Sequence, residues 1–552
     1  MNSPLPPSWA VTSSEAALGT RPFAITAGNS LAWDGRDPRS DEWSGDLARL
    51  ARQGSVSLGG NFAGRFLSFV SYAVLARLLG PASLGLYAIG MALLQMLEGV
   101  ARLGMSSGVV RLGTKYRRTA PTALKQVLTV AAALTGGCGV LVAGALWMLA
   151  PWIASEIFDT ASLAVVIRWF AAAVPLVALL RVVAAATRVT LRTQYSVWTS
   201  EIAPGIANLL LLAAFWLAGE TLLGAIAARV LSFVVALAIG LYLLRRLFPG
   251  SLSVHQYDRG TARQLLSFSL PTALASVLSG LLLSMDRLLI GVFYTPADVG
   301  VYQVAAQTAL VLGSLLAGVN AIFVPMAADL HHLGERQRLE SLFRITTRWG
   351  LHLATPLFLV LIVFPREVLS VLYGAEYRSA AASLVILSCG QFVNIATGAA
   401  GSVLTMSGYP KRWLAITVSA VAVNLGLNLI LIPRAGIAGA AAATSLATLL
   451  LFSAALWQVR TKVGIWPYDR RYGKSVGAAL VTAVILGLVP LSGLTGFWLL
   501  ASAALASYTA FALSLTAFGL DPEERRLLTW ITSLVSPRRR NFHDAHPDLG
   551  PA

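Results

Sequence analysis

The sequence predicts an all-α membrane protein in which about fourteen transmembrane helices form two parallel six-helix bundles and two extra C-terminal helices. The 552-residue chain is 56% hydrophobic and only 12% charged, with a mean hydropathy of +0.70, whereas soluble domains are about 25% charged. The apolar residues form continuous runs of roughly 20, which suits helices rather than the alternating strands of a barrel. A heptapeptide at residues 81–87 recurs at 296–302, after 215 residues, which indicates two similar halves.

The first 55 residues are polar and rich in Pro, Ser, Gly and Asp. They contain no apolar core of the kind that a signal peptide needs. Such a composition is typical of disordered segments. We therefore predict a disordered cytoplasmic tail at residues 1–55.

Fourteen apolar runs follow, and each is predicted to cross the membrane once. They cover residues 56–79, 84–107, 126–149, 162–184, 197–218, 222–244, 265–292, 298–325, 346–365, 381–404, 412–433, 436–457, 475–492 and 496–518. The predicted domains are an N-terminal bundle at 56–244, a cytoplasmic linker at 245–264, a C-terminal bundle at 265–457, two extra transmembrane helices at 475–518 and a cytoplasmic tail at 519–552.

The loops predict the orientation. Most Lys and Arg residues lie in the loops after even-numbered runs, whereas the loops after odd-numbered runs offer mainly Arg366, Arg378 and Arg434. Positively charged loops stay on the cytoplasmic side, so both termini are expected in the cytoplasm. This topology explains the net charge of +17 without nucleic acid as a partner.

The repeat predicts how the halves are related. A second match, residues 224–228 with 439–443, keeps the offset of 215. Six runs separate the copies, and six is even, so the halves have the same orientation and an axis along the membrane normal relates them. We expect each heptapeptide to close a helical hairpin at an outer turn, with Pro and Gly shaping the turn and Tyr at the membrane interface. The residues given this structural role are Pro81, Gly85, Tyr87, Pro296, Gly300 and Tyr302.

Several ionisable residues fall within the runs, where a charge costs about 2.5–3.5 kcal/mol. Arg65 lies nine residues into its run, about 13 Å deep, which favours a functional role. Arg102 follows Glu98 by one helical turn, so the two are either a neutralising pair or part of a site. Arg181 and Arg229 lie nearer the ends of their runs, where snorkelling to the interface is an equal alternative.

Asp286 and Arg287 lie within two turns of the outer end of the seventh run. Together these residues give more buried cations than carboxylates, and arginine is well suited to phosphate because its guanidinium binds in a bidentate manner. The predicted substrate-binding residues are Arg65, Arg102, Arg181, Arg229 and Arg287. Glu98 and Asp286 are predicted to couple H⁺ or Na⁺ or to balance charge. Arg77, at the outer boundary, is interpreted as an anchor.

Uncharged polar residues within the runs are expected mainly to bond between helices, with cavity lining as the alternative. The set is Gln303, Gln307, Asn320, Gln391, Asn394, Asn424 and Asn428. The chain has no Walker A sequence, no Cys/His cluster and no long outer loop, so no cofactor, metal or enzymatic activity is expected.

Five motifs resemble those of bacterial polysaccharide-biosynthesis flippases, and the similarity covers about residues 50–520. The motifs are Ala76-Arg-Leu-Leu-Gly-Pro-Ala-Ser-Leu-Gly-Leu-Tyr87, Asp286-Arg-Leu-Leu-Ile-Gly291, Val299-Gly-Val-Tyr302, Met406-Ser-Gly-Tyr-Pro-Lys-Arg412 and Gly436-Ile-Ala-Gly-Ala-Ala441.

The resemblance implies a MATE-like fold in the bacterial inner membrane. It also implies translocation of undecaprenyl-pyrophosphate-linked oligosaccharides by alternating access, for exopolysaccharide, capsule or the O-antigen of lipopolysaccharide. A polymerase and glycosyltransferases are the partners expected in such a pathway. The alternatives are a lipid II flippase, a multidrug antiporter and, from another class, a polysaccharide polymerase or ligase. An antiporter for cationic drugs would prefer an acidic cavity, and a polymerase usually needs a substantial outer loop.

Overall fold

The computed structural model describes residues 38–189, 193–248, 259–489 and 493–519. The chain divides into two compact units, Met1–Ala51 and Arg52–Ala552. The first unit contributes a helical segment from residue 38 to 51. The second contains all the features described below.

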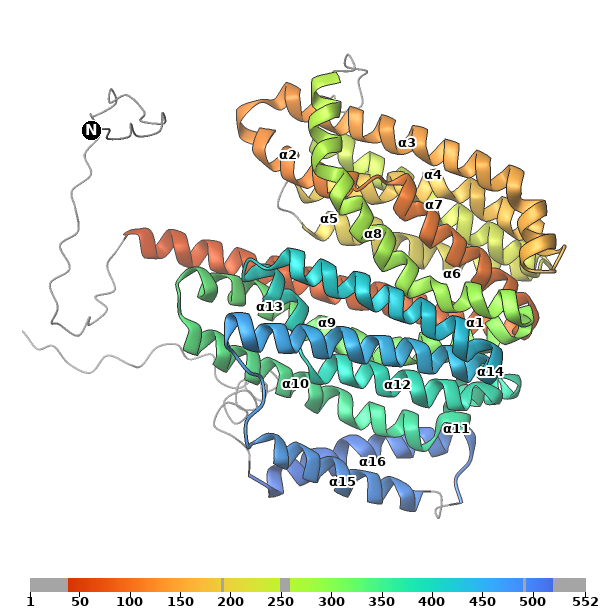
Figure 1. Ribbon diagram of the computed structural model, residues 1–552, viewed down its shortest axis with the longest axis vertical. Helices are drawn as coiled ribbons and strands as arrows, with labels where there is room; N and C mark the ends of the chain where they lie inside the picture. The colour runs from red at the N-terminus through yellow and green to blue at the C-terminus, as the bar shows by residue number, and fades with distance from the viewer. Residues whose placement is uncertain (1–37, 190–192, 249–258, 490–492, 520–552) are drawn as a thin grey trace, which may run out of the picture. The chain divides into compact units, whose positions relative to one another are not determined.

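Helices account for nearly all of the described residues (Figure 1). The first half forms α1 (Pro38–Ala101), α2 (Met105–Thr119), α3 (Pro121–Trp152), η1 (Ile153–Ile157), α4 (Leu163–Arg188), α5 (Thr193–Val197), η2 (Trp198–Ile202), α6 (Ala203–Leu217) and α7 (Leu222–Leu247). The second half forms α8 (Arg259–Phe293), α9 (Pro296–His332), α10 (Arg336–Val363), α11 (Pro365–Leu372), η3 (Ala375–Ala380), α12 (Ala381–Ala396), α13 (Ala400–Met406) and α14 (Pro410–Gln458). It is followed by η4 (Val459–Val463), α15 (Tyr472–Leu488) and α16 (Gly496–Ala517).

Glycine and proline set the breaks that the apolar runs leave undefined. In α1, Gly80 has φ 69° and Pro81 follows it, so one helical segment ends and the next begins within two residues. In α14, Gly436 has φ 57° and divides the helix in the same way. Thr295 and Asp298 form a capping box that starts α9 at Pro296.

The helices pack mainly within their own half. The helices α2, α3, α4 and α7 contact one another, and α9, α10, α12 and α14 form a second group that runs side by side in Figure 1. The helix α8 joins the two groups, because it packs against α2 and α3 as well as α14. The helices α15 and α16 pair with each other and cover α10.

Ten of the described helices are long and apolar enough to cross a membrane, or eleven if the bent pair within α8 counts as one span. Two of the ten, Gly59–Ala101 and Pro410–Val463, each contain the glycine break described above and cover two of the predicted runs. Helix α15 has 17 residues and falls below that length. The number fourteen and the grouping into two bundles of six therefore stay predictions.

Three details differ from what the sequence predicted. Part of the predicted tail, residues 38–55, is helical, and residues 1–37 lie outside the described part. The helices α7 and α8 extend into the predicted linker at 245–264. The motif tyrosines pack inside the protein rather than on its surface: Tyr87 is 2% exposed and Tyr302 is fully buried.

Candidate functional site

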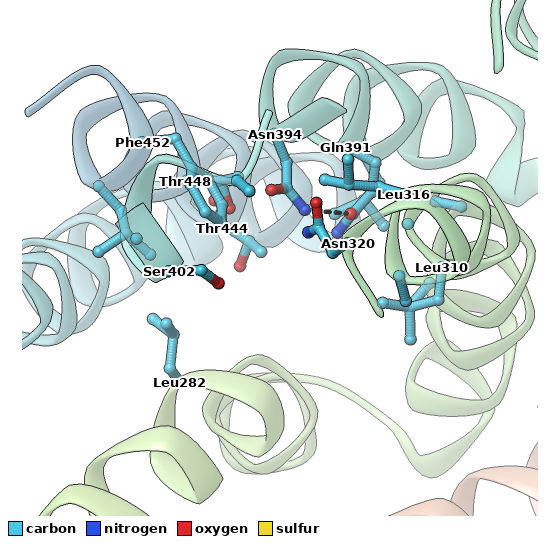
Figure 2. Close-up of a pocket in the computed structure, with 18 of the residues that line it drawn as sticks. Leu282, Leu310, Leu316, Asn320, Gln391, Asn394, Ser402, Thr444, Thr448 and Phe452 are labelled. Atoms are coloured by element: carbon cyan, nitrogen blue, oxygen red, sulfur yellow. Dashed lines mark hydrogen bonds between the residues drawn. The ribbon is translucent and has the colours of Figure 1, made fainter. Parts of the chain in front are cut away.

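A cavity of about 600 Å³ lies among the second-half helices, with residues from α8, α9, α12, α13 and α14 and one residue of α1 in its wall (Figure 2). This volume falls within the range of small-molecule sites. Small residues on α9 create the space: Ala306, Ala309, Gly313 and Ala317 recur at intervals of three or four residues on one face of the helix. A larger side chain at any of these positions would fill part of the cavity.

Arg65 is the residue that α1 contributes, and its side chain is exposed to this space. The preceding residue explains its direction. A Cβ atom on Gly64 would lie 2.5 Å from Cβ of Glu201, so this face of α1 is pressed against η2. Successive helical residues point about 100° apart, and Arg65 consequently points away from η2.

Asp286 and Arg287 of α8 also line the cavity and are both buried. The hydroxyl of Tyr302 donates a hydrogen bond of 2.6 Å to Oδ2 of Asp286. Tyr302 is the last residue of the second heptapeptide, so the repeat holds the carboxylate in place. The structural role of Tyr302 was predicted at an outer turn; its position at the cavity wall was not.

A buried polar group continues from this carboxylate. Nδ2 of Asn424 donates to Oγ1 of Thr444, which lines the cavity, at 3.2 Å, and Nδ2 of Asn428 donates to Oδ1 of Asn424 at 3.1 Å. Oδ1 of Asp286 and Oδ1 of Asn428 are buried without a hydrogen-bond partner in the structure. A buried acceptor oxygen without a donor is costly. No cluster of three or more His, Cys, Asp or Glu residues that could hold a metal exists in the described ranges.

Three of the remaining predicted charges of the first half, Glu98, Arg102 and Arg181, lie in a separate group. Arg102 lies 3.5 Å from the Glu98 carboxylate, which confirms the predicted pair. Arg181 bonds Oε1 of Glu201 at 3.1 Å. Arg188, which the sequence did not single out, lies within electrostatic range of Arg102, Arg181 and Glu201.

A helix break lies beside this group. Helix α1 ends at Ala101, and α2 begins at Met105 after Leu103 and Gly104, whose φ values are 51° and 68°. A Cβ atom on Gly104 would overlap the carbonyl oxygen of Ser269 in α8. Glycine is therefore required both by the left-handed conformation and by the close approach of α8.

Arg229 belongs to neither group. Its guanidinium lies 4.7 Å from the centre of the Phe233 ring, one turn further along α7. The structure thus brings Arg65 and Arg287 together with Asp286 at the cavity, places Arg102 and Arg181 with Glu98 and Glu201 elsewhere, and leaves Arg229 in a cation–π contact.

The two heptapeptides contact each other directly. A Cβ atom on Gly85 would overlap the carbonyl oxygen of Pro296 and lie 3.0 Å from the Gly300 nitrogen. A Cβ atom on Gly300 would overlap the carbonyl oxygen of Pro81 and lie 3.0 Å from the Gly85 nitrogen. The contact is reciprocal, as an approximate two-fold axis requires. We call this end of the helices the motif end.

Three further hydrogen bonds, made by two side chains, join the halves at the motif end. Arg77 donates to the carbonyl oxygens of Val371 and Leu372 at the end of α11, the latter at 2.9 Å. The Tyr377 hydroxyl donates to the carbonyl oxygen of Ala76 at 3.0 Å. Arg77, which the sequence suggested was a membrane anchor, instead caps α11.

This chain is similar to a family model, to curated relatives and to solved structures. The family model for polysaccharide biosynthesis proteins matches residues 74–382. A relative from Haloferax volcanii, named probable low-salt glycan biosynthesis flippase Agl15, is 30% identical over 188 residues, which is 34% of this chain and 39% of the relative. The probable flippase AglR of the same organism is 24% identical over 450 residues, 80% of this chain and 90% of the relative.

Among solved structures, the lipid II flippase MurJ in an inward closed conformation superposes with a TM-score of 0.66 at 16% identity, covering 85% of this chain and 98% of MurJ. An inward-facing multidrug resistance transporter of the MATE family gives 0.60 at 14% identity, with 72% of this chain and 94% of that one covered. These likenesses show that the fold is that of the MurJ and MATE transporters.

Proposed function

Because the chain belongs to the family of polysaccharide biosynthesis proteins, we propose that it is a flippase that moves polyprenyl-pyrophosphate-linked oligosaccharides across the membrane. The observation that carries the proposal is the cavity, where Arg65 and Arg287 face a space among membrane helices with Asp286 as the carboxylate beside them. The coarse activity agrees with the two relatives named as probable flippases.

The chemistry of the cavity favours an anionic substrate. Burying a charge in a membrane protein is costly, so arginines are retained there where they serve a pathway or a partner. Two guanidinium groups can each bind phosphate through two parallel hydrogen bonds. A pyrophosphate offers two such groups, and a cationic drug would be repelled by the same residues.

Translocation would proceed by alternating access. In the described structure, Gly85 with Gly300, Arg77 with α11 and Tyr377 with Ala76 join the halves at the motif end. Separation of these contacts would open the motif end, while the opposite, basic end would close. From the distribution of Lys and Arg in the loops, we infer that the motif end faces outward and that both termini are cytoplasmic.

Arg102 and Arg181 form a second, weaker candidate for contact with the substrate, because neither lines the cavity. Arg229 is a still weaker candidate because its charge lies over the Phe233 ring. Glu98, which pairs with Arg102, fits charge balance better than ion coupling.

Asp286 is the better candidate for coupling. Its Oδ1 atom is buried without a hydrogen-bond donor in the structure, and either a proton or Na⁺ could bind there. Occupancy of this site beside Arg287 would change the charge of the cavity wall and so couple ion binding to substrate binding.

The first prediction tests the cationic site. Replacing Arg65 with Ala should reduce polymer export at least tenfold in a strain that depends on this protein, because a charge-assisted contact with phosphate in the cavity is lost. Lysine at this position should restore part of the export, since it keeps the charge but loses the bidentate geometry. Arg245→Ala, an exposed arginine in the last turn of α7, is the matched control.

Export is measured as surface polymer at equal membrane levels of each variant. Full export by the Arg65→Ala variant would overturn the proposal. Which polymer disappears in the deletion strain (exopolysaccharide, capsule, O-antigen or peptidoglycan) separates an oligosaccharide flippase from a lipid II flippase.

A further inference from the structure

Three amide side chains gather at one part of the cavity, Asn320 from α9 and Gln391 and Asn394 from α12, as Figure 2 shows. Nδ2 of Asn394 donates to Oε1 of Gln391 at 3.4 Å. Gly313 of α9 leaves space for the side chain of Gln391, because a Cβ atom on Gly313 would lie 2.9 Å from Oε1 of Gln391. We call these three residues the amide cluster.

Most of the hydrogen-bonding capacity of the amide cluster faces the cavity. Each amide has two N–H donors and one acceptor oxygen, whereas the bond between Gln391 and Asn394 is long and uses one donor. All three side chains are only half-buried. By contrast, Asn424 and Asn428 are fully buried and bond to each other and to Thr444. Asn424 and Asn428 therefore join helical segments, whereas the amide cluster is available to a ligand.

The amide cluster lies on a wall of the cavity without formal charge. The charged lining residues, Arg65, Asp286 and Arg287, come from α1 and α8. The lining residues from α9, α12 and α13 are apolar or carry amide and hydroxyl groups, among them Ser402 and Thr405. Gly313, which contacts Gln391, lies 11 residues from Tyr302, which bonds Asp286, or about 17 Å along the axis of α9.

This neutral wall suits a sugar. A sugar ring presents hydroxyl groups that both donate and accept hydrogen bonds. An amide can also donate and accept, and its burial does not carry the desolvation cost of a charge. Trp413 and Phe452 add aromatic surface for the C–H faces of the ring. The cavity volume of about 600 Å³ leaves room for a sugar beside a pyrophosphate.

We propose that the amide cluster binds the sugar that is attached to the pyrophosphate, and that it selects a neutral sugar over an acidic one. The inference rests on the proposed function, in which Arg65 and Arg287 hold the pyrophosphate. The arginines bind the pyrophosphate, which all such lipids share. The amide cluster recognises the attached sugar, which differs between them.

The experiment measures binding to the purified full-length protein in lipid nanodiscs. The probes are polyprenyl pyrophosphate without a sugar and the same lipid bearing one glucose, N-acetylglucosamine or galacturonic acid. The unmodified protein should bind at least one of the two neutral-sugar lipids more tightly than the bare lipid, and the galacturonic acid lipid no more tightly. Substituting both Gln391→Met and Asn394→Leu should remove this gain, about tenfold, and leave binding of the bare lipid unchanged.

Two control variants distinguish failure of the proposed function from failure of this inference. Arg65→Ala should weaken binding of all four lipids, and if it does not, the proposed function fails. Asn208→Leu, a buried amide of α6 outside the cavity, should change nothing. If the double variant is unstable, Asn394→Leu alone should remove part of the gain. A gain that survives in these variants, a preference for the acidic sugar, or no gain for any sugar would overturn the inference while leaving the flippase proposal intact.

Discussion

Tyr302 and Tyr87 occupy the same position in the two heptapeptides, yet their side chains have different partners. Tyr302 donates to Asp286, whereas the Tyr87 ring packs edge-on between Tyr72 and Phe170. Both side chains are buried. The duplication therefore kept the aromatic ring in both halves and gave one hydroxyl a charged partner.

This difference yields a prediction with a built-in control. Tyr302→Phe should lower the free energy of unfolding by about 1.5–3 kcal/mol, because a buried carboxylate loses its donor. Tyr87→Phe should have a much smaller effect. Thermal melting of the two purified variants in the same detergent compares them, and equal shifts would show that the hydrogen bond to Asp286 does not stabilise the fold.

The sequence identified the charged residues of the cavity but not their surroundings. Arg65 and Asp286 stand out because charges are rare in apolar runs. Gln391, Asn394 and Asn320 were expected mainly to bond between helices, with cavity lining as the alternative, because an amide within a membrane helix has the same sequence signal in both cases. That distinction depends on side-chain exposure, which only the packed helices define.

Among the elements, the heptapeptides act as a pair rather than as two separate turns. Gly85 and Gly300 each approach the backbone of the other copy so closely that neither leaves space for a Cβ atom. This is how small residues bring membrane helices together. The Pro–Gly pattern was predicted to shape each turn; the contact between the turns requires the tertiary arrangement.

A single methyl group should therefore separate the halves. Gly85→Ala or Gly300→Ala should cost about 1–3 kcal/mol of stability through overpacking and reduce export. Gly144→Ala in α3, where nothing lies within 4 Å of the added atom, should be neutral or stabilising by up to about 1 kcal/mol. Thermal melting and polymer export are measured for all three, and a stable, active Gly85→Ala variant would argue against a closed contact at the motif end.

The helices were easier to predict than their breaks. Predicted runs such as 222–244 and 162–184 match α7 and α4 within a few residues because apolar length is a direct signal. The break at residues 102–104 was missed, since one glycine among 48 in the chain gives no local signal of its own. The demand for that glycine comes from α8, which is distant in sequence.

At the scale of the whole molecule, two similar halves carry unlike chemistry. The first half contributes Arg65 and the paired charges around Arg102 and Arg181, and the second half supplies most of the cavity. The cavity wall therefore combines Arg65 from the first half with Arg287, Asp286 and the amide cluster from the second half, so it lacks the two-fold symmetry of the repeat.

The orientation of the whole chain in the membrane can be tested directly. Cys138 and Cys389 are first replaced by Ala, and single cysteines are introduced at Ala161, between α3 and α4, or at Leu333, between α9 and α10, which are both exposed. An impermeant maleimide should label position 161 in intact cells and position 333 only after permeabilisation. The reverse pattern would place the motif end in the cytoplasm.

The reciprocal glycine contact also bears on the history of the chain. An interface in which residue i of one copy meets residue j of the other, and j meets i, is the geometry of a symmetric homodimer. Here it lies within one polypeptide, between segments 215 residues apart in the sequence. Once two such subunits are fused, each half can change its charges independently, but neither can change this contact alone. The heptapeptides have stayed alike where the surrounding halves have diverged.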